Sequence, residues 1–391
     1  MRQEHRHAVR MLVLAVLAAV ALVAAGCGGS DESDDGASTG AAATQEAAAT
    51  QASETNPAVE EARAAVEAKS QAPTDIGVTE PLKESVRGKK VVFEQCLAPI
   101  CALIGSQVKD AAQHLGVDVQ IISTGATPDT ITKAFNAGVA ANPDALIGST
   151  IPTVLWSAQA HELKDKGIPI ITNATLVDPK DKDAVVAEFY DDQVTASVGV
   201  EDANFVIADS DGTAKTVYVF TPEFQGLFPQ VDAYRDKLKA DCPECSFERL
   251  DVKSTDVGKV IPGRVVSYLQ QHPDVKYVVF QYGDLATGVP QALKAAGIEG
   301  VKLVSSGGGP VNYQYIQAGE QDRDLSLYLD VYGWQIMDAT AKAMVGQEVT
   351  VPPLPDGWIT QDNDDFDPKQ QPPFGDPDWK QKFLELWKVS T

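Results

Sequence analysis

The residues best able to do chemistry in this chain are its five cysteines. Cys96 and Cys101 form one close pair, Cys242 and Cys245 form another, and Cys27 stands alone. Redox-active pairs place one thiol at a helix N-terminus, which lowers its pKa, whereas Cys242 and Cys245 close a predicted helix and open a predicted strand. We therefore expect a structural disulfide there. For Cys96 and Cys101, a disulfide that shapes a loop and two buried free thiols remain open alternatives.

Sequence patterns that would indicate an enzyme or a metal site do not occur. His161-Glu162 is followed by Asp165 where a zinc-binding helix needs its second histidine, and Gly-x-Ser-x-Gly is absent. The acidic stretch 362–365 lacks the glycine and the terminal glutamate of a calcium loop. The glycine-rich run 306–309 could cradle an anion, but it lacks the lysine of a phosphate loop, which favours a turn near a hinge. We expect no catalytic residue, no metal and no cofactor.

The N-terminus has the features of a bacterial export signal. Arg2, Arg6 and Arg10 precede an apolar run over 11–26, which is short for a spanning helix of about 18 to 20 apolar residues. The run ends in Val23-Ala24-Ala25-Gly26-Cys27, which resembles a lipobox and implies that Cys27 is lipidated and becomes the mature N-terminus. An uncleaved membrane anchor is the alternative. Without Cys27 the cysteines are even in number, as expected outside the cytoplasm.

The segment after the signal, 27–56, is rich in small and polar residues without an apolar period, and we expect a disordered tether. Its r.m.s. reach would be roughly 30 Å. The net charge of −23 argues against nucleic acid as a partner. A short helix is predicted from Pro57 to about Lys69, with Asn56 as its cap, within a lead-in over 57–87.

From residue 89 onwards, apolar strands alternate with helices. The predicted strands are 91–93, 119–122, 145–147, 168–171, 217–220, 247–252, 277–280 and 301–304. This alternation predicts an α/β fold of parallel sheets with helices on both faces. Two such runs, separated near 176–195, predict two Rossmann-like domains, and roughly 300 ordered residues is too many for one core.

Five motifs in this body resemble the sugar-type, ribose-like periplasmic binding proteins. They are 111–118, 142–147 (Asn-Pro-Asp-Ala-Leu-Ile), 167–171 (Gly-Ile-Pro-Ile-Ile), 272–275 and 283–297, and they follow one another at the family's spacing. LacI-type regulators share this body, but they begin with a DNA-binding helix-turn-helix instead of an export signal.

The resemblance implies the periplasmic-binding-protein-like I fold, with two domains joined by a three-crossing hinge. The first domain would comprise 88–185 plus 307–330, and the second 186–306 plus 331–350. A C-terminal extension over 351–391 would follow, with a docked amphipathic helix from Trp379 to Trp387.

The ligand is expected between the domains, at the carboxyl ends of both sheets. Only six loops leave strands at these ends: 95–101, 149–153, 173–175, 221–230, 281–284 and 305–309. The candidate ligand-binding residues in them are Gln95, Leu97, Thr150, Asn173, Phe224, Gln230, Tyr282, Asp284 and Gly308. Asp284 is the strongest candidate because a carboxylate at a strand end accepts hydrogen bonds from two neighbouring hydroxyls; an N-cap for the following helix is the alternative.

The sequence departs from the sugar-binding pattern at three charged positions, which fall on Asn173-Ala174, Gln230 and Gly307. Aromatic residues remain nearby, at Phe224, Phe228, Tyr282 and Trp156. These departures indicate a ligand that is a sugar or sugar-like and less polar than a simple pentose or hexose.

The resemblance implies a function in solute binding. We expect a monomeric lipoprotein, anchored to the outer face of the cell membrane, that closes on a small molecule and delivers it to an ABC permease. The same clamp could instead serve a membrane receptor kinase. A hydrolase is disfavoured because no nucleophile and base are paired.

Overall fold

The computed structural model describes residues 56–388. The expected signal sequence, Cys27 and the tether before residue 56 lie outside this range. Among the described residues, no helix is both long and apolar enough to cross a membrane. The first described helix, α2 (Pro57–Ala68), starts where the sequence predicts, and the side chain of Asn56 accepts a hydrogen bond from the backbone N of Ala58 at 3.1 Å.

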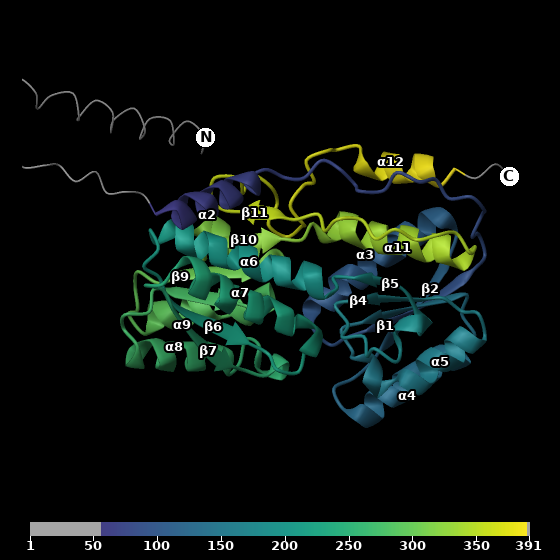
Figure 1. Ribbon diagram of the computed structural model, residues 1–391, viewed down its shortest axis with the longest axis horizontal. Helices are drawn as coiled ribbons and strands as arrows, with labels where there is room; N and C mark the ends of the chain where they lie inside the picture. The colour runs from purple at the N-terminus through teal and green to yellow at the C-terminus, as the bar shows by residue number, and fades with distance from the viewer. Residues whose placement is uncertain (1–55, 389–391) are drawn as a thin grey trace, which may run out of the picture. The chain divides into compact units, whose positions relative to one another are not determined.

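One sheet has five parallel strands in the order β2-β1-β3-β4-β5. Its strands are β1 (Lys90–Gln95), β2 (Asp118–Ser123), β3 (Ala145–Ser149), β4 (Ile170–Asn173) and β5 (Val185–Phe189). Its helices are α3 (Pro99–Leu115), α4 (Pro128–Ala140), α5 (Ser157–Asp165) and α11 (Leu329–Met344). Helices α3 and α11 cover one face, and α4 and α5 cover the other (Figure 1). We call this sheet and its helices the first lobe.

The other sheet has six strands in the order β11-β10-β9-β8-β6-β7, of which only β11 is antiparallel to its neighbour. Its strands are β6 (Lys215–Phe220), β7 (Ser246–Asp251), β8 (Tyr277–Phe280), β9 (Lys302–Ser306), β10 (Arg323–Ser326) and β11 (Gly357–Ile359). Its helices are α6 (Asp192–Asp209), α7 (Phe228–Asp241), α8 (Ile261–Gln271), α9 (Val289–Ala295) and α10 (Pro310–Ala318). We call this sheet and its helices the second lobe.

Five short 3₁₀ helices lie in the connections of the two lobes. They are η1 (Thr153–Leu155), η2 (Lys182–Ala184), η3 (Gln225–Leu227), η4 (Ser254–Asp256) and η5 (Gly283–Ala286).

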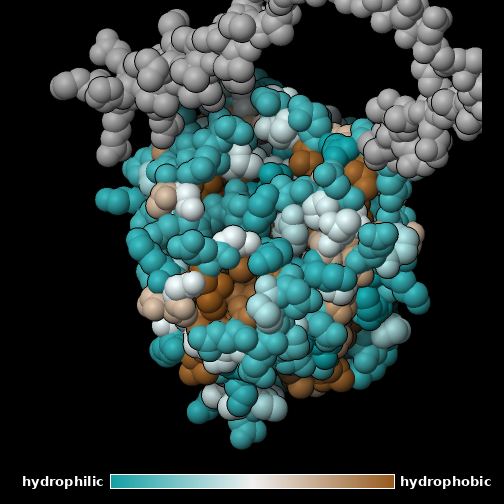
Figure 2. All heavy atoms as spheres, turned by 90° about the vertical axis from the view of Figure 1, so that its left-hand side faces the viewer, coloured by the Kyte–Doolittle hydropathy of each residue, from teal (hydrophilic) through white to brown (hydrophobic). Residues whose placement is uncertain are grey.

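The burial pattern explains why these strands are parallel and central. Every residue of β3 and β8 is buried, as expected for strands covered by helices on both faces. Helix α3 buries the stripe that includes Ile104, Val108 and Leu115, and it ends at Gly116, whose φ of 69° suits glycine. Figure 2 shows hydrophilic residues over most of one face of the molecule. The predicted fold class is confirmed.

The second and third crossings between the lobes lie later in the chain than predicted. Residues 307–330 were expected in the first domain, but β10 pairs with β9 in the second sheet. Residues 331–350 were expected in the second domain, but α11 packs on α3 and on strands of the first sheet. Strand β5, which was not predicted, extends the first sheet to Phe189, past the predicted boundary at 185. The other domain bounds stay predictions.

The segments before β1 and after α11 run along the same side of both lobes (Figure 1). Near the second lobe, α2 packs on α6, and the backbone N of Trp358 in β11 donates to the O of Lys69 at 2.7 Å. Over the first lobe, the predicted C-terminal helix is present as α12 (Trp379–Leu386), and Trp387 beyond it stacks on Trp334 of α11 at 5.1 Å. Together the two segments contact both lobes.

Both cysteine pairs form disulfides in the structure. The Cys242–Cys245 bond follows α7 and precedes β7, as predicted. The Cys96–Cys101 bond joins the loop after β1 to the first turn of α3 and is buried. Of the two alternatives that the sequence left open for Cys96 and Cys101, the structure therefore has the disulfide and not two free thiols.

Candidate functional site

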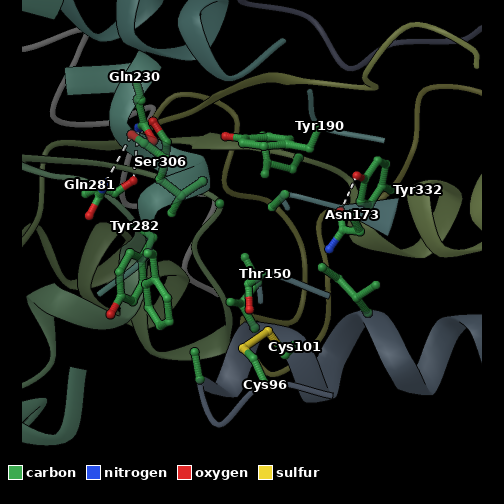
Figure 3. A pocket seen from close by; sticks show the side chains of 18 residues that line it. Cys96, Cys101, Thr150, Asn173, Tyr190, Gln230, Gln281, Tyr282, Ser306 and Tyr332 are labelled. Atoms are coloured by element: carbon green, nitrogen blue, oxygen red, sulfur yellow. Dashed lines mark hydrogen bonds between the residues drawn. A yellow bond between two sulfur atoms is a disulfide. The ribbon is translucent and has the colours of Figure 1, made fainter. Parts of the chain in front are cut away.

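A cavity of about 60 Å³ lies between the two lobes, and interfaces between domains are preferred places for ligand pockets. All six predicted loops contribute to its lining. The lining residues are Cys96, Ala98, Ile100, Cys101, Ile104, Thr150, Asn173, Ala174, Tyr190, Phe224, Leu227, Gln230, Gln281, Tyr282, Ser306, Gly307, Leu327 and Tyr332. Figure 3 shows the disulfide at the start of α3 on one side and the Gln230, Gln281 and Ser306 group on another.

Five of the residues predicted from the sequence line this cavity. They are Thr150 and Asn173 from the first lobe, and Phe224, Gln230 and Tyr282 from the second. Their role as ligand contacts stays a prediction, but the structure brings them to one space.

Three other predicted residues lie beside the cavity without lining it. The side chain of Gln95 turns towards α3, because a Cβ on Gly105 would lie 2.9 Å from its Oε1. Leu97 is 58 % exposed at the outer edge. Gly308 lies one residue beyond Gly307, which does line the cavity. The backbone N of Gly308 donates to Oδ1 of Asp324 at 3.0 Å.

Asp284 is also absent from the lining. Its Oδ2 faces the first lobe and accepts a long hydrogen bond of 3.4 Å from the backbone N of Ile100, in the first turn of α3. Burial raises the pKa of Asp284 to about 6, although the N–H of Ile100 opposes the shift. The alternative role, an N-cap of the following helix, is not observed, because the N-cap of α9 is Gly288 and no side chain caps that helix. Asp284 therefore joins the lobes.

The polar residues from the second lobe form a connected network (Figure 3). Nε2 of Gln230 donates to the backbone O of Gln281 at 3.0 Å and to Oδ2 of Asp202 at 3.3 Å. Ser306 donates to Oδ1 of Asp202 at 2.7 Å, and Thr221 donates to Oε1 of Gln281 at 2.7 Å. Asp202 is fully buried behind the cavity, and burial raises its pKa to about 8. These partners fix the orientation of the side chains before any ligand is bound.

The first-lobe side of the cavity is held in the same way. Nδ2 of Asn173 donates to Oγ of Ser149 at 3.2 Å, and the hydroxyl of Tyr332 on α11 donates to Oδ1 of Asn173 (Figure 3). Thr150 donates to the backbone O of Ser149 at 2.8 Å. The amide of Asn173 thus has a defined orientation, with α11 as part of its support.

The remaining walls are apolar and uncharged. The rings of Phe224 and Tyr282 pack with their centroids 5.7 Å apart, while the first lobe contributes Ile100 and the disulfide from Cys96 to Cys101. Among the described residues that line the cavity, none carries a charged side chain. A buried ionic group of a ligand would find no counter-charge here, so the cavity suits an uncharged molecule.

Three lining residues have strained backbone conformations. Thr150, Ala174 and Tyr190 follow β3, β4 and β5 with φ values of 63°, 50° and 54°. Residues other than glycine adopt this left-handed region at a cost, and such strain concentrates at ligand clamps. All three residues line the cavity.

The lobes touch around the cavity through glycine. A Cβ on Gly226, in the second lobe, would lie 2.5 Å from the backbone O of Ala174 in the first. A Cβ on Gly307 would lie 3.2 Å from the side chain of Ile100 in α3. Because a Cβ at Gly226 would collide with backbone of the other lobe, the structure represents lobes in direct contact.

Four lining residues lie outside the loops expected from the sequence: Ile104, Tyr190, Leu327 and Tyr332. Tyr190 and Leu327 lie where the chain passes between the lobes, and Tyr332 belongs to α11, which was expected in the other domain. Ile104 was recognised only as part of the apolar stripe of α3. Conversely, Trp156 is buried against Phe135, with ring centroids 4.3 Å apart, and does not line the cavity.

Metal ligands do not gather in the part of the chain that the structure describes. No group of three or more His, Cys, Asp or Glu side chains there is arranged to hold a metal ion.

Comparison with known proteins gives one family and a set of related folds. A family model described as "periplasmic binding protein domain" matches residues 98–348. No curated protein matches the chain.

The solved structures that resemble the chain are distant in sequence. A 5-methylthioribose transporter solute binding protein from Thermotoga lettingae is 17 % identical, with a TM-score of 0.65 over 78 % of this chain and 99 % of its own. A periplasmic ribose ABC transporter protein from Conexibacter woesei is 21 % identical, with a TM-score of 0.60 over 72 % of this chain and 95 % of its own. The fructose-binding periplasmic domain of a hybrid two-component system is 15 % identical, with a TM-score of 0.61 over 70 % and 91 %. These similarities show the fold.

Proposed function

Because this chain belongs to the periplasmic binding protein domain family, we propose that it captures a small uncharged solute between its lobes and delivers it to an ABC permease. The observation that carries the proposal is the cavity, which both lobes line without contributing a charged side chain from the described residues. A ligand there contacts both lobes only when they close. This differential contact favours the closed form, which a permease would recognise.

The proposed ligand is a sugar-like molecule that carries an apolar group. Thr150, Asn173 and Gln230 offer hydroxyl and amide groups that exchange hydrogen bonds with ligand hydroxyls. Phe224 and Tyr282 offer aromatic walls for the apolar part. One structurally similar protein was solved with 5-methylthioribose, a pentose that bears a methylthio group, and a ligand of this kind fits both halves of the lining.

A second candidate function is ligand sensing for a membrane receptor kinase. It is favoured by the similarity to the fructose-binding periplasmic domain of a hybrid two-component system. Uptake measurements separate the two functions. Deleting the gene should abolish uptake of the radiolabelled ligand if the protein serves a permease, and should leave uptake intact if it serves a kinase.

We also propose that the protein is a monomeric lipoprotein outside the cytoplasm, attached to the membrane through Cys27. The lipobox-like sequence before Cys27 supports this. Stable attachment takes more than one acyl chain, since each buried CH₂ contributes about 0.8 kcal/mol. A Cys27→Ala variant should be released from membranes on fractionation, and retention of that variant would instead indicate an uncleaved helix.

The ligand proposal is tested by a thermal-shift screen of neutral sugars, methylthio sugars, sugar phosphates and amino acids, followed by calorimetry. A ligand at 100 times its Kd adds about 2.7 kcal/mol of stability, so a neutral sugar-like compound should raise the melting temperature. Phe224→Ala should weaken its binding. Phe228→Ala is the matched control, because Phe228, the first residue of α7, is 37 % exposed and does not line the cavity. Tight binding of charged compounds alone would refute the proposal.

A further inference from the structure

A second cavity lies away from the cleft, between the start of α11 and the C-terminal extension. Its volume is about 210 Å³. Its lining residues are Tyr328, Asp330, Val331, Phe366, Asp367, Gln370, Gln371, Pro372, Pro373, Phe374 and Trp379. We call it the extension pocket. It shares no lining residue with the cleft, and most of its lining lies beyond the matched family domain, which ends at residue 348.

Aromatic rings form much of the extension pocket and are held in place by one another. Phe374 packs edge-on against Tyr328, with ring centroids 5.9 Å apart, and against Trp379 at 6.5 Å. Phe366 packs in the same manner against Tyr313 at 5.4 Å. The faces of such rings carry negative partial charge and attract cations.

The charged side chains of the pocket have one sign. Asp330 and Asp367 line it, and no Lys, Arg or His does so among the described residues. Oδ1 of Asp330 is buried and has no hydrogen-bond partner in the described part of the chain. Burial raises the pKa of Asp330; Lys380 opposes this shift, but its Nζ is paired with Asp110 at 2.8 Å. Among residues 56–388, Asp330 forms no salt bridge of its own, and the nearby Lys380 is paired with Asp110.

We propose that the extension pocket binds a small organic ammonium ion. The ammonium group would pair with Asp330, and its alkyl groups would contact Tyr328, Phe374 and Trp379. Aromatic rings combined with a carboxylate are the arrangement that recognises ammonium groups. A hydrated divalent ion would gain little from the ring and proline walls, since such ions take mainly oxygen ligands. The proposal is independent of the solute bound in the cleft, whose lining is uncharged.

The test is calorimetric titration of the full chain, with choline, tetramethylammonium and putrescine as probes and 3,3-dimethylbutan-1-ol as the neutral isostere of choline. At least one ammonium probe should bind, and the isostere should not. Asp330→Asn should weaken that binding at least tenfold. Asp362→Asn is the matched control, because Asp362 is an exposed carboxylate of the same extension that does not line the pocket.

Further variants keep the outcome decisive. Phe224→Ala, in the cleft, should leave ammonium binding unchanged. If this variant lost ammonium binding, the probe would bind in the cleft and the assignment would be overturned. Phe374→Ala should weaken ammonium binding, and its melting curve shows whether it folds. The proposal is overturned if none of the three ammonium probes binds, if the isostere binds equally well, or if Ca²⁺ binds in an Asp330-dependent manner and displaces them.

Discussion

Replacing Glu94 by glutamine should change how the stability of the protein depends on pH. Glu94 lies in β1 and is fully buried, with 0 % of its surface exposed. Neither carboxylate oxygen has a hydrogen-bond partner among residues 56–388. Its Oε1 lies against Gly138 of α4, where an added Cβ would collide with it. Burial without partners raises the pKa of Glu94 to about 8, because the charged form cannot be solvated.

The size and sign of the effect follow from the two pKa values. The unfolded chain releases the proton of Glu94 near its ordinary pKa of 4.5, whereas the folded chain keeps it until about 8. The folded state binds the extra proton between these values, so stability is retained below the lower pKa and lost as pH rises towards the upper one. One pKa unit corresponds to about 1.36 kcal/mol. Between about pH 5 and about pH 8, the wild-type chain should lose about 3 to 4 kcal/mol relative to a variant without this ionisation.

Urea unfolding, followed by tryptophan fluorescence at several pH values, measures this difference. The free energy of unfolding of Glu94→Gln minus that of the wild type should rise by about 3 to 4 kcal/mol over the interval. Glu188→Gln is the matched control: Glu188 occupies the same row of the sheet, but it is only partly buried and lies 3.9 Å from Lys182. Parallel pH profiles for the wild type and Glu94→Gln would refute the reasoning.

Two further predictions concern closure of the lobes. Gly226→Ala should weaken ligand binding at least tenfold and leave the melting temperature of the ligand-free protein nearly unchanged, because the new Cβ meets the O of Ala174 only when the lobes touch. Gly263→Ala is the control, since a Cβ there would have no neighbour within 4 Å. Equal ligand affinities of Gly226→Ala and the wild type would contradict the closure contact. Asp284 is buried against Ile100 with its pKa raised to about 6, so the closed form should bind a proton that an open form, with the ordinary pKa of about 3.9, releases. Calorimetry with a neutral ligand should show that the affinity rises about tenfold from about pH 7 to about pH 5. Asp284→Asn should remove this pH dependence. If the variant instead lost affinity by the same factor at every pH, Asp284 would contact the ligand directly.

All eight predicted strands are present. Central runs such as 277–280 are buried throughout, as expected for strands covered by helices on both faces. The edge strands β2 and β7 are largely exposed or half-buried, and their alternation with helices is what predicts them. Strand β10 escaped prediction because half of its residues, Arg323 and Asp324, are charged. Its buried Asp324 is stabilised by donors from Ser305 and from the backbone N of Gly308, which come together only in the folded chain.

The location of the cleft was predictable, whereas its residues were predictable only in part. Parallel strands place their carboxyl ends at one edge, so the six loops could be named without knowing how the lobes meet. Which side chain of a loop lines the cavity depends on the contact between lobes: Asp284 points to Ile100, and neighbouring Tyr282 lines the cavity instead. Tyr332 could not be predicted to line the cavity, because residues 307–330, which contain β10, were expected in the first domain, and α11 was therefore expected in the second.

Contacts between the lobes and contacts with the ligand should therefore have separable effects on binding. The apparent Kd of a clamp is its intrinsic Kd divided by the fraction of molecules able to close. Gly226 belongs to the lobe contact and does not line the cavity, so Gly226→Ala should weaken every cleft ligand by one common factor. Phe224 lines the cavity, so Phe224→Ala should weaken ligands with an apolar group more than plain sugars. Measuring both variants against a plain sugar and its methylthio derivative distinguishes the two effects. If Gly226→Ala changed the ratio of the two affinities, closure and recognition would not be independent, and the cavity lining alone could not account for selectivity.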